Sequence, residues 1–127
     1  MSRITVNSEN GPKAIGPYVH ACWAGDLLYL SGQTPIDPKT NKLVKNDITH
    51  QTEQAFNNLE TVLKDAGLSL EQVIKCNVYL TSMQNFAGMN AVYSSRFSAP
   101  YPARTTVAVA ELPLGALVEI EMVAKKG

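Results

Sequence analysis

Apolar and polar residues alternate with two different periods along this chain. Alternation with period two, or a short apolar run, occurs at residues 3–6, 20–23, 27–31, 74–80, 102–109 and 118–122. These segments are predicted to be β-strands, because successive side chains of a strand point to opposite faces. Gly25 and Asp26 separate the second and third segments, which we therefore expect to form a hairpin.

Helical spacing appears in two longer stretches. Between residues 48 and 66, apolar side chains recur every three or four positions, as in a helix with one buried face. Asp47 precedes this stretch as a suitable N-cap, and Gly67 follows it as a stop. A second helix is predicted from 83 to 97, with Ser82 as its cap.

The order of these elements predicts an α+β fold. Five or six strands and two helices are expected, with both helices packed on one face of the sheet. The length of 127 residues fits a single domain, residues 1–127. Residues 27–30 are apolar without interruption, so the opposite face of the sheet also needs cover. One chain of this length has no third layer to offer, and we expect subunits to associate through the sheet.

Composition and charge exclude several classes of protein. Hydrophobic residues make up 45% of the chain and charged residues 17%, which is typical of a globular protein. Eleven basic and eleven acidic side chains cancel, so no electrostatic preference for nucleic acid or an anionic membrane is expected. No apolar run approaches the roughly 20 residues of a membrane helix. A cytoplasmic location is predicted.

Cysteine and histidine usage gives no sign of a metal site or a cofactor. Cys22 and Cys76 form no metal-binding motif, and His20 and His50 lack the spacing of metal ligands. Cys76 falls on the apolar face of its strand, where a thiol usually fills the core. Free thiols fit a reducing compartment.

The candidate chemistry lies in the last two predicted strands. Arg104 and Thr106 share one strand face, and Glu119 and Glu121 share another. If these strands pair, one sheet face presents a guanidinium, a hydroxyl and two carboxylates, which suits a pocket for a small carboxylic acid. The alternative is a cross-strand Arg–Glu ion pair on a solvated sheet. Periodicity alone does not separate Glu119 from Glu121.

Three other positions are candidates for a pocket. Tyr18 follows Gly16-Pro17 at a strand start, where its hydroxyl either reaches a pocket mouth or belongs to a packing tyrosine. Asn90 lies in an apolar helical stripe, so its amide either pins a loop or lines a pocket. Ser31 lacks the flanking pattern of a nucleophile, which favours a hydrogen-bonding role.

Several segments together resemble the YjgF/RidA family in order and spacing. They are AIGPY at 14–18, LSGQ at 30–33, MNAVY at 89–93, PAR at 102–104 and VEIE at 118–121. The similarity runs from about residue 3 to residue 125. It implies a chorismate-mutase-like α+β fold and a homotrimer whose sheets form a central barrel, with clefts at the subunit interfaces.

The resemblance also implies an activity. Family members deaminate reactive 2-imino acids, such as 2-iminobutanoate and 2-iminopropanoate, by hydrolysis to 2-oxo acids and ammonia. This protects pyridoxal-phosphate enzymes from damage and requires no cofactor. Arg104 would bind the substrate carboxylate, and Glu119 would position water. The remaining implied site residues are Tyr18, Ser31, Gly32, Asn90 and Thr106, the last at a position where some members carry Cys.

Two other functions are alternatives to the hydrolase. The first is a non-catalytic trimeric binder of small 2-oxo acids or a stress-protective chaperone. A binder needs Arg104 but no carboxylate that handles water, so Arg104 together with Glu119 favours the hydrolase. The second is a nuclease or translation inhibitor, a label that relatives also carry. The neutral charge and the absence of clustered basic and aromatic residues argue against it.

Overall fold

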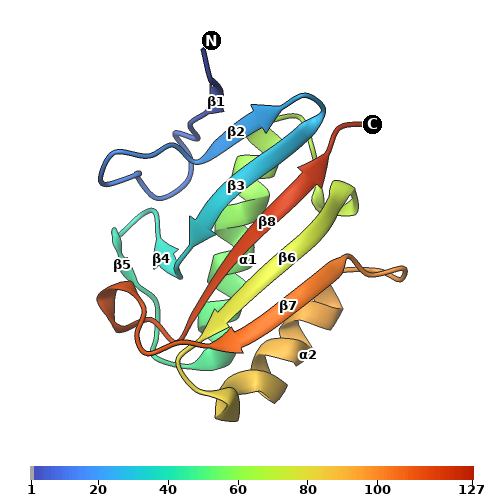
Figure 1. Cartoon of the computed structure of the whole chain (residues 1–127). Coiled ribbons are helices and arrows are strands. Elements are labelled where there is room, and N and C mark those ends of the chain that lie inside the picture. The colour runs from blue at the N-terminus through green and yellow to red at the C-terminus, as the bar shows by residue number, and fades with distance from the viewer. Residues whose placement is uncertain (1) are drawn as a thin grey trace.

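A computed structural model describes residues 2–127 as a six-stranded mixed sheet with two helices on one face (Figure 1). The sheet order is β1-β2-β3-β8-β6-β7. The elements are β1 (Ile4–Val6), β2 (Ala21–Ala24), β3 (Leu27–Gln33), α1 (Ile48–Asp65), β6 (Val73–Leu80), α2 (Phe86–Arg96), β7 (Ala103–Ala108) and β8 (Val118–Lys125), with a small ribbon of β4 (Ile36–Asp37) and β5 (Lys42–Leu43). The predicted α+β class and the placement of both helices are confirmed.

The helix boundaries follow local signals in the sequence. Asp47 caps α1 by accepting a hydrogen bond from His50 N, and Gly67 ends it with a φ of +81°, as expected. The second helix starts later than predicted. Residues Met83–Asn85 form a separate 3₁₀ turn, in which Ser82 Oγ accepts a hydrogen bond from Gln84 N, and α2 begins only at Phe86.

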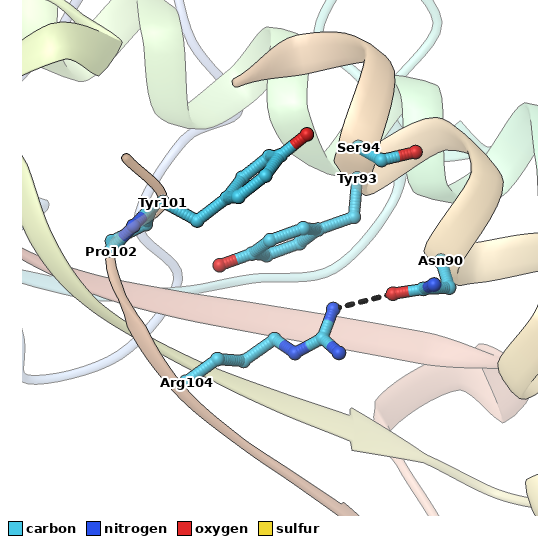
Figure 2. Close-up of a pocket in the computed structure, with 6 residues that line it drawn as sticks. All are labelled: Asn90, Tyr93, Ser94, Tyr101, Pro102 and Arg104. Atoms are coloured by element: carbon cyan, nitrogen blue, oxygen red, sulfur yellow. Dashed lines mark hydrogen bonds between the residues drawn. The ribbon is translucent and has the colours of Figure 1, made fainter. Parts of the chain in front are cut away.

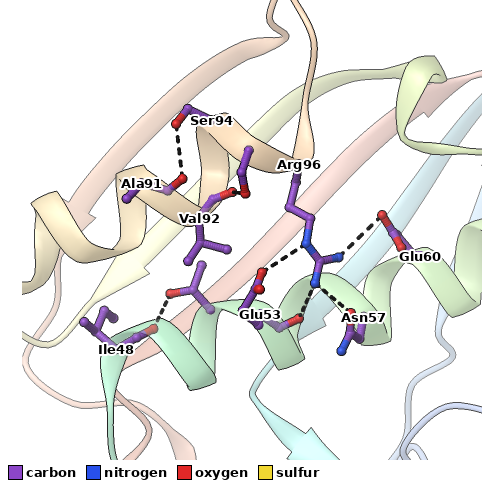
Figure 3. Close-up of polar contacts among 10 residues, drawn as sticks. Ile48, Glu53, Asn57, Glu60, Ala91, Val92, Ser94 and Arg96 are labelled. Carbon is purple, nitrogen blue, oxygen red and sulfur yellow. Dashed lines mark hydrogen bonds and ion pairs between the residues drawn. The ribbon is translucent and has the colours of Figure 1, made fainter.

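Arg96 ties the two helices together at the end of α2 (Figure 3). Its Nε donates to Glu53 Oε1 at 3.1 Å, and its Nη2 donates to Asn57 Oδ1 at 2.8 Å. Its Nη1 lies 3.5 Å from Glu60 Oε1. These contacts with α1 fix the position of α2, the helix that carries Asn90.

The core lies between the helices and the sheet. Every second residue of β8, and of β6 from Cys76 onward, is buried there, and Cys76 is fully buried, which confirms it as a core residue. The buried residues of the two strands are Val73, Cys76, Val78, Leu80, Val118, Ile120, Met122 and Ala124. The intervening side chains point to the opposite face, which no described element of the protomer covers (Figure 1).

The strands that carry Arg104 and Glu119, whose pairing would put both side chains on one face, are separated by β6. β7 pairs with β6 in parallel, and β6 pairs with β8 in antiparallel. Arg104 lies opposite the core residue Cys76, whereas Glu119 lies opposite Tyr79 on the uncovered face. The expectation that Arg104 and Glu119 share one sheet face is therefore wrong. An earlier strand inserts between them and fixes the two side chains on opposite faces.

Candidate active site in two halves

The Arg104 side chain is held by several contacts between the edge strand β7 and helix α2 (Figure 2). Its Nη1 donates a hydrogen bond of 2.7 Å to Asn90 Oδ1. Its guanidinium carbon lies 4.5 Å from the centroid of the Tyr93 ring and 5.6 Å from that of Phe86. A pocket of about 420 Å³ opens here; its lining is Asn90, Tyr93, Ser94, Tyr101, Pro102 and Arg104.

This environment suits the binding of a carboxylate. The guanidinium is a planar fork that pairs with a carboxylate through two parallel hydrogen bonds. Asn90 holds one nitrogen of Arg104, and the Tyr93 ring supports the guanidinium group by a cation–π contact. Asn90 therefore orients Arg104, in addition to lining the pocket. Tyr93 was missed as a site residue, although its spacing of three from Asn90 places both on one side of the helix.

Thr106 lies two residues beyond Arg104 on the same face of β7. Its Oγ1 is buried and has no hydrogen-bond partner within residues 2–127, and the same holds for Tyr93 Oη. Neighbouring Cys76 is not a reactive group, because burial raises the pKa of its thiol to about 11. We call Arg104, Asn90, Tyr93 and Thr106 the Arg104 half-site.

Glu119 lies half-buried on the other face of the sheet. Burial raises the pKa of its carboxyl group above the usual value, and the nearby charge of Glu121 acts in the same direction. No hydrogen bond to this carboxylate is found in the part of the chain that the structure describes. A carboxylate with a raised pKa and free oxygens is a better general base than an ordinary glutamate.

Glu121 has the opposite environment. Its Oε1 accepts a hydrogen bond of 3.0 Å from Asn77 Nδ2 and another from the Tyr79 hydroxyl. The bond to Glu121 helps raise the pKa of Tyr79 to about 12, so this hydroxyl remains a donor at neutral pH. Glu121 is thus held in the sheet by strand β6. The structure therefore distinguishes Glu119 from Glu121 by their hydrogen bonds, whereas strand periodicity did not distinguish them.

A β-bulge in β3 makes room for Glu119. Leu30 pairs with Met122 and Gln33 pairs with Ile120, so two residues of β3 lie opposite one residue of β8. A Cβ atom on the second bulge residue, Gly32, would collide with Glu119 Oε2. A larger residue at this position would therefore displace the Glu119 carboxylate from the place it occupies.

The bulge also holds the chain next to Tyr18. Ser31 Oγ donates to Val19 O at 2.6 Å, and Ser31 N donates to His20 O at 2.9 Å. The Tyr18 side chain is 50% exposed and precedes these anchored residues. We call Glu119, Gly32 and Ser31, together with Tyr18 on the chain that Ser31 anchors, the Glu119 half-site. The predicted site residues thus fall into two groups, which the sheet separates within one protomer.

The fold and the two half-sites define a class of small α+β proteins with an arginine held between the edge strand and α2 and a glutamate on the uncovered sheet face. A family model described as endoribonuclease L-PSP matches residues 8–126. The chain belongs to this family, which is the YjgF/RidA family that its motifs resemble. Within residues 2–127, no three His, Cys, Asp or Glu side chains cluster as a metal site, and no helix is long and apolar enough to cross a membrane.

Three similar proteins illustrate the family. The RutC family protein PH0854 of Pyrococcus horikoshii is 50% identical over 119 residues, 94% of each chain. A protein of Dermatophagoides farinae named 2-iminobutanoate/2-iminopropanoate deaminase is 38% identical, over 93% of this chain and 92% of its own. The crystal structure of Escherichia coli TdcF with bound serine has a TM-score of 0.92 at 35% identity, covering 98% of this chain and 99% of that one.

Proposed function

We propose that this protein deaminates 2-imino acids such as 2-iminobutanoate and 2-iminopropanoate by hydrolysis, giving 2-oxo acids and ammonia. The observation that carries the proposal is Glu119, a half-buried carboxyl with a raised pKa that accepts no hydrogen bond from any group of residues 2–127. A non-catalytic binder of 2-oxo acids has no need for such a group. A relative named for this activity supports the proposal, as does a relative that binds serine, a small 2-amino acid.

The chemistry requires a bound carboxylate and an activated water. Arg104 pairs with the carboxylate of the imino acid and fixes the C=N carbon. Glu119 takes a proton from water as the oxygen bonds to that carbon, and the imine nitrogen gains a proton. The hydroxyl of the tetrahedral adduct then loses its proton, the nitrogen gains a second one, and the C–N bond breaks as C=O forms, so that ammonia leaves. The Tyr18 and Thr106 hydroxyls would support the developing tetrahedral centre.

A substrate contacts both half-sites only where two copies of the chain meet. We therefore propose a homotrimer of the chorismate-mutase-like kind, whose uncovered sheet faces form a central barrel. Tyr29 and Val107, 51% and 42% exposed on that face, would be buried there. The edge strand β7 of one copy would bring Arg104 to the Glu119 half-site of the next in a closed ring. The proposed role is protection of pyridoxal-phosphate enzymes in the cytoplasm.

A direct assay tests the proposed activity. An amino-acid dehydratase or oxidase generates the imine, and its disappearance is followed in the presence and absence of this protein. We expect faster decay and matching release of ammonia. Unchanged imine decay by an assembled protein that still binds a 2-oxo acid would contradict the hydrolase and favour the binder.

A further inference from the structure

His20 is a buried polar residue outside both half-sites. It is 3% exposed, and each ring nitrogen has a backbone partner. Ser8 N donates to Nδ1 at 2.8 Å, and Nε2 lies 2.7 Å from the carbonyl oxygen of Pro12. A carbonyl only accepts and an amide N–H only donates, so Nδ1 is the acceptor and Nε2 the donor of these two bonds.

These bonds hold an irregular segment of the chain, residues 7–18, which has no helix or strand. A third bond joins His20 N to Asn7 Oδ1 at 3.3 Å. Among the hydrogen bonds of residues 2–127, the ones that tie this segment to the rest of the chain all involve His20. Ser8, Gly11 and Pro12 are buried and packed, whereas Ile15 and Tyr18 are 75% and 50% exposed, so packing adds little restraint at the end of the segment that carries Tyr18.

His20 is itself fixed to the bulge beside Glu119. The carbonyl oxygen of His20 accepts a hydrogen bond of 2.9 Å from Ser31 N. Gly32, which follows Ser31, lies so close to the Glu119 side chain that a Cβ atom there would collide with its carboxylate. One residue therefore connects the Tyr18 segment to the backbone that surrounds the proposed general base.

We propose that His20 is a positioning residue, which fixes the 7–18 segment through its imidazole ring and so holds Tyr18 in place relative to Glu119. This rests on the proposed function in assigning Tyr18 to the reaction. Without the ring, the segment before Tyr18 loses its anchors at Ser8 and Pro12, and only the backbone bonds at Val19 and His20 remain, so the Tyr18 hydroxyl meets the tetrahedral centre less often. The substrate carboxylate remains bound to Arg104, so the loss falls on kcat and not on KM.

A double-mutant cycle tests whether His20 acts through Tyr18. We expect His20→Ala and Tyr18→Phe each to lower kcat by about tenfold with little change in KM. His20→Ala added to Tyr18→Phe should then cause no further loss, because the lost contact is the same. Losses that multiply in the double variant, or a changed KM with an unchanged kcat, would overturn the proposal.

Hydrogen exchange tests, without an activity assay, whether His20 fixes the 7–18 segment. In the assembled protein, His20→Ala should speed exchange of the amides in residues 7–18 and leave β6 and β8 protected. His20→Gln, whose amide supplies a neutral donor and acceptor, should restore part of the protection. Val62→Ala, a cavity variant in the core of α1, is the control for general destabilisation and should not expose the segment selectively.

The two experiments separate failure of the role proposed for His20 from failure of the proposed function. Unchanged amide exchange in residues 7–18 of His20→Ala would refute the positioning role of His20, whatever the activity of the variant. A wild-type protein without imine turnover would refute the proposed function, and the exchange result would then decide the role of His20 alone.

Discussion

The two half-sites are built in opposite ways. Arg104 is surrounded by groups that hold it: an amide oxygen at 2.7 Å and an aromatic ring at 4.5 Å. Glu119 lacks such partners, since its neighbour in β3 is a glycine and no donor within residues 2–127 bonds to its carboxylate. A charge that must bind a ligand is fixed by partners, whereas a carboxylate that must accept a proton is left without them.

Glu121 supports this contrast within a single strand. It shares a face with Glu119, yet Asn77 and Tyr79 both donate to it. A hydrogen bond to the ionised form makes a carboxylate a weaker base. Glu121, two positions from Glu119, is therefore bound within the sheet, because two side chains of β6 donate hydrogen bonds to it.

The largest effect is expected from Glu119→Gln, which removes the only proposed base. The amide nearly matches the carboxylate in size but does not accept a proton from water at neutral pH. We predict a fall in kcat of about 10²–10⁴, with the affinity for a 2-oxo acid nearly unchanged because Arg104 provides that binding. Imine decay and product titration measure the two quantities.

Glu121→Gln is the matched control and should remain active, since Gln Oε1 still accepts hydrogen bonds. Its pH profile carries a further signal. Wild-type activity should fall as the pH drops through the Glu119 pKa, which lies above the usual glutamate value of 4.5. Removing the Glu121 charge should move this acid limb to lower pH. An inactive Glu121→Gln with a normal Glu119→Gln would reverse the two roles.

Arg104→Lys tests the other half of the comparison. A lysine keeps the charge but not the two parallel hydrogen bonds to a carboxylate. We predict a loss of about 10²-fold in kcat/KM, mainly through KM. Arg96→Lys makes the same exchange at the clamp between α1 and α2 and should cost stability with little loss of activity. Near-wild-type turnover by Arg104→Lys would place the anchor elsewhere.

Gly32→Ala tests whether Glu119 depends on the missing side chain. The new methyl group would collide with Glu119 Oε2 and displace the carboxylate from the water. We predict about a tenfold lower kcat in a folded protein, checked by steady-state kinetics and thermal unfolding. A kcat equal to that of the wild type would show that Gly32 is not required for the site.

Thr106→Val should have the smallest effect. Thr106 Oγ1 is buried and has no hydrogen-bond partner among residues 2–127, and replacing it with a methyl group of similar size removes an unsatisfied hydroxyl. We predict a free energy of unfolding equal to or slightly above that of the wild type and an activity within about threefold, because Arg104 carries the binding. Complete inactivity of an assembled variant would assign the hydroxyl a direct role in the reaction.

Much of the fold follows from local pattern. The helical stripe after Asp47, the stop at Gly67 and the hairpin at Gly25 each depend on neighbouring residues, and all three are present. The start of α2 was misplaced because Ser82 caps a 3₁₀ turn and not the helix itself. Local capping signals do not distinguish these two kinds of turn.

The arrangement of the site did not follow from local pattern. Alternation shows that Arg104 and Thr106 share a face, but both faces of β7 carry polar and apolar residues, so the buried face is ambiguous. Strand order depends on contacts distant in sequence, and β6 lies between β7 and β8. The alternation of Asn77 and Tyr79 with the buried Val78 was the available signal that β6 has its own polar face.

Subunit complementation tests most directly whether each site is assembled from two copies of the chain. Arg104→Lys and Glu119→Gln are each strongly impaired, but a mixed assembly contains interfaces where an intact Arg104 meets an intact Glu119 of the next copy. For random equal mixing in a closed ring, we predict about a quarter of the wild-type activity. Arg104→Lys mixed with the double variant should gain nothing. Mixed assemblies no more active than their parents would contradict a site shared between subunits.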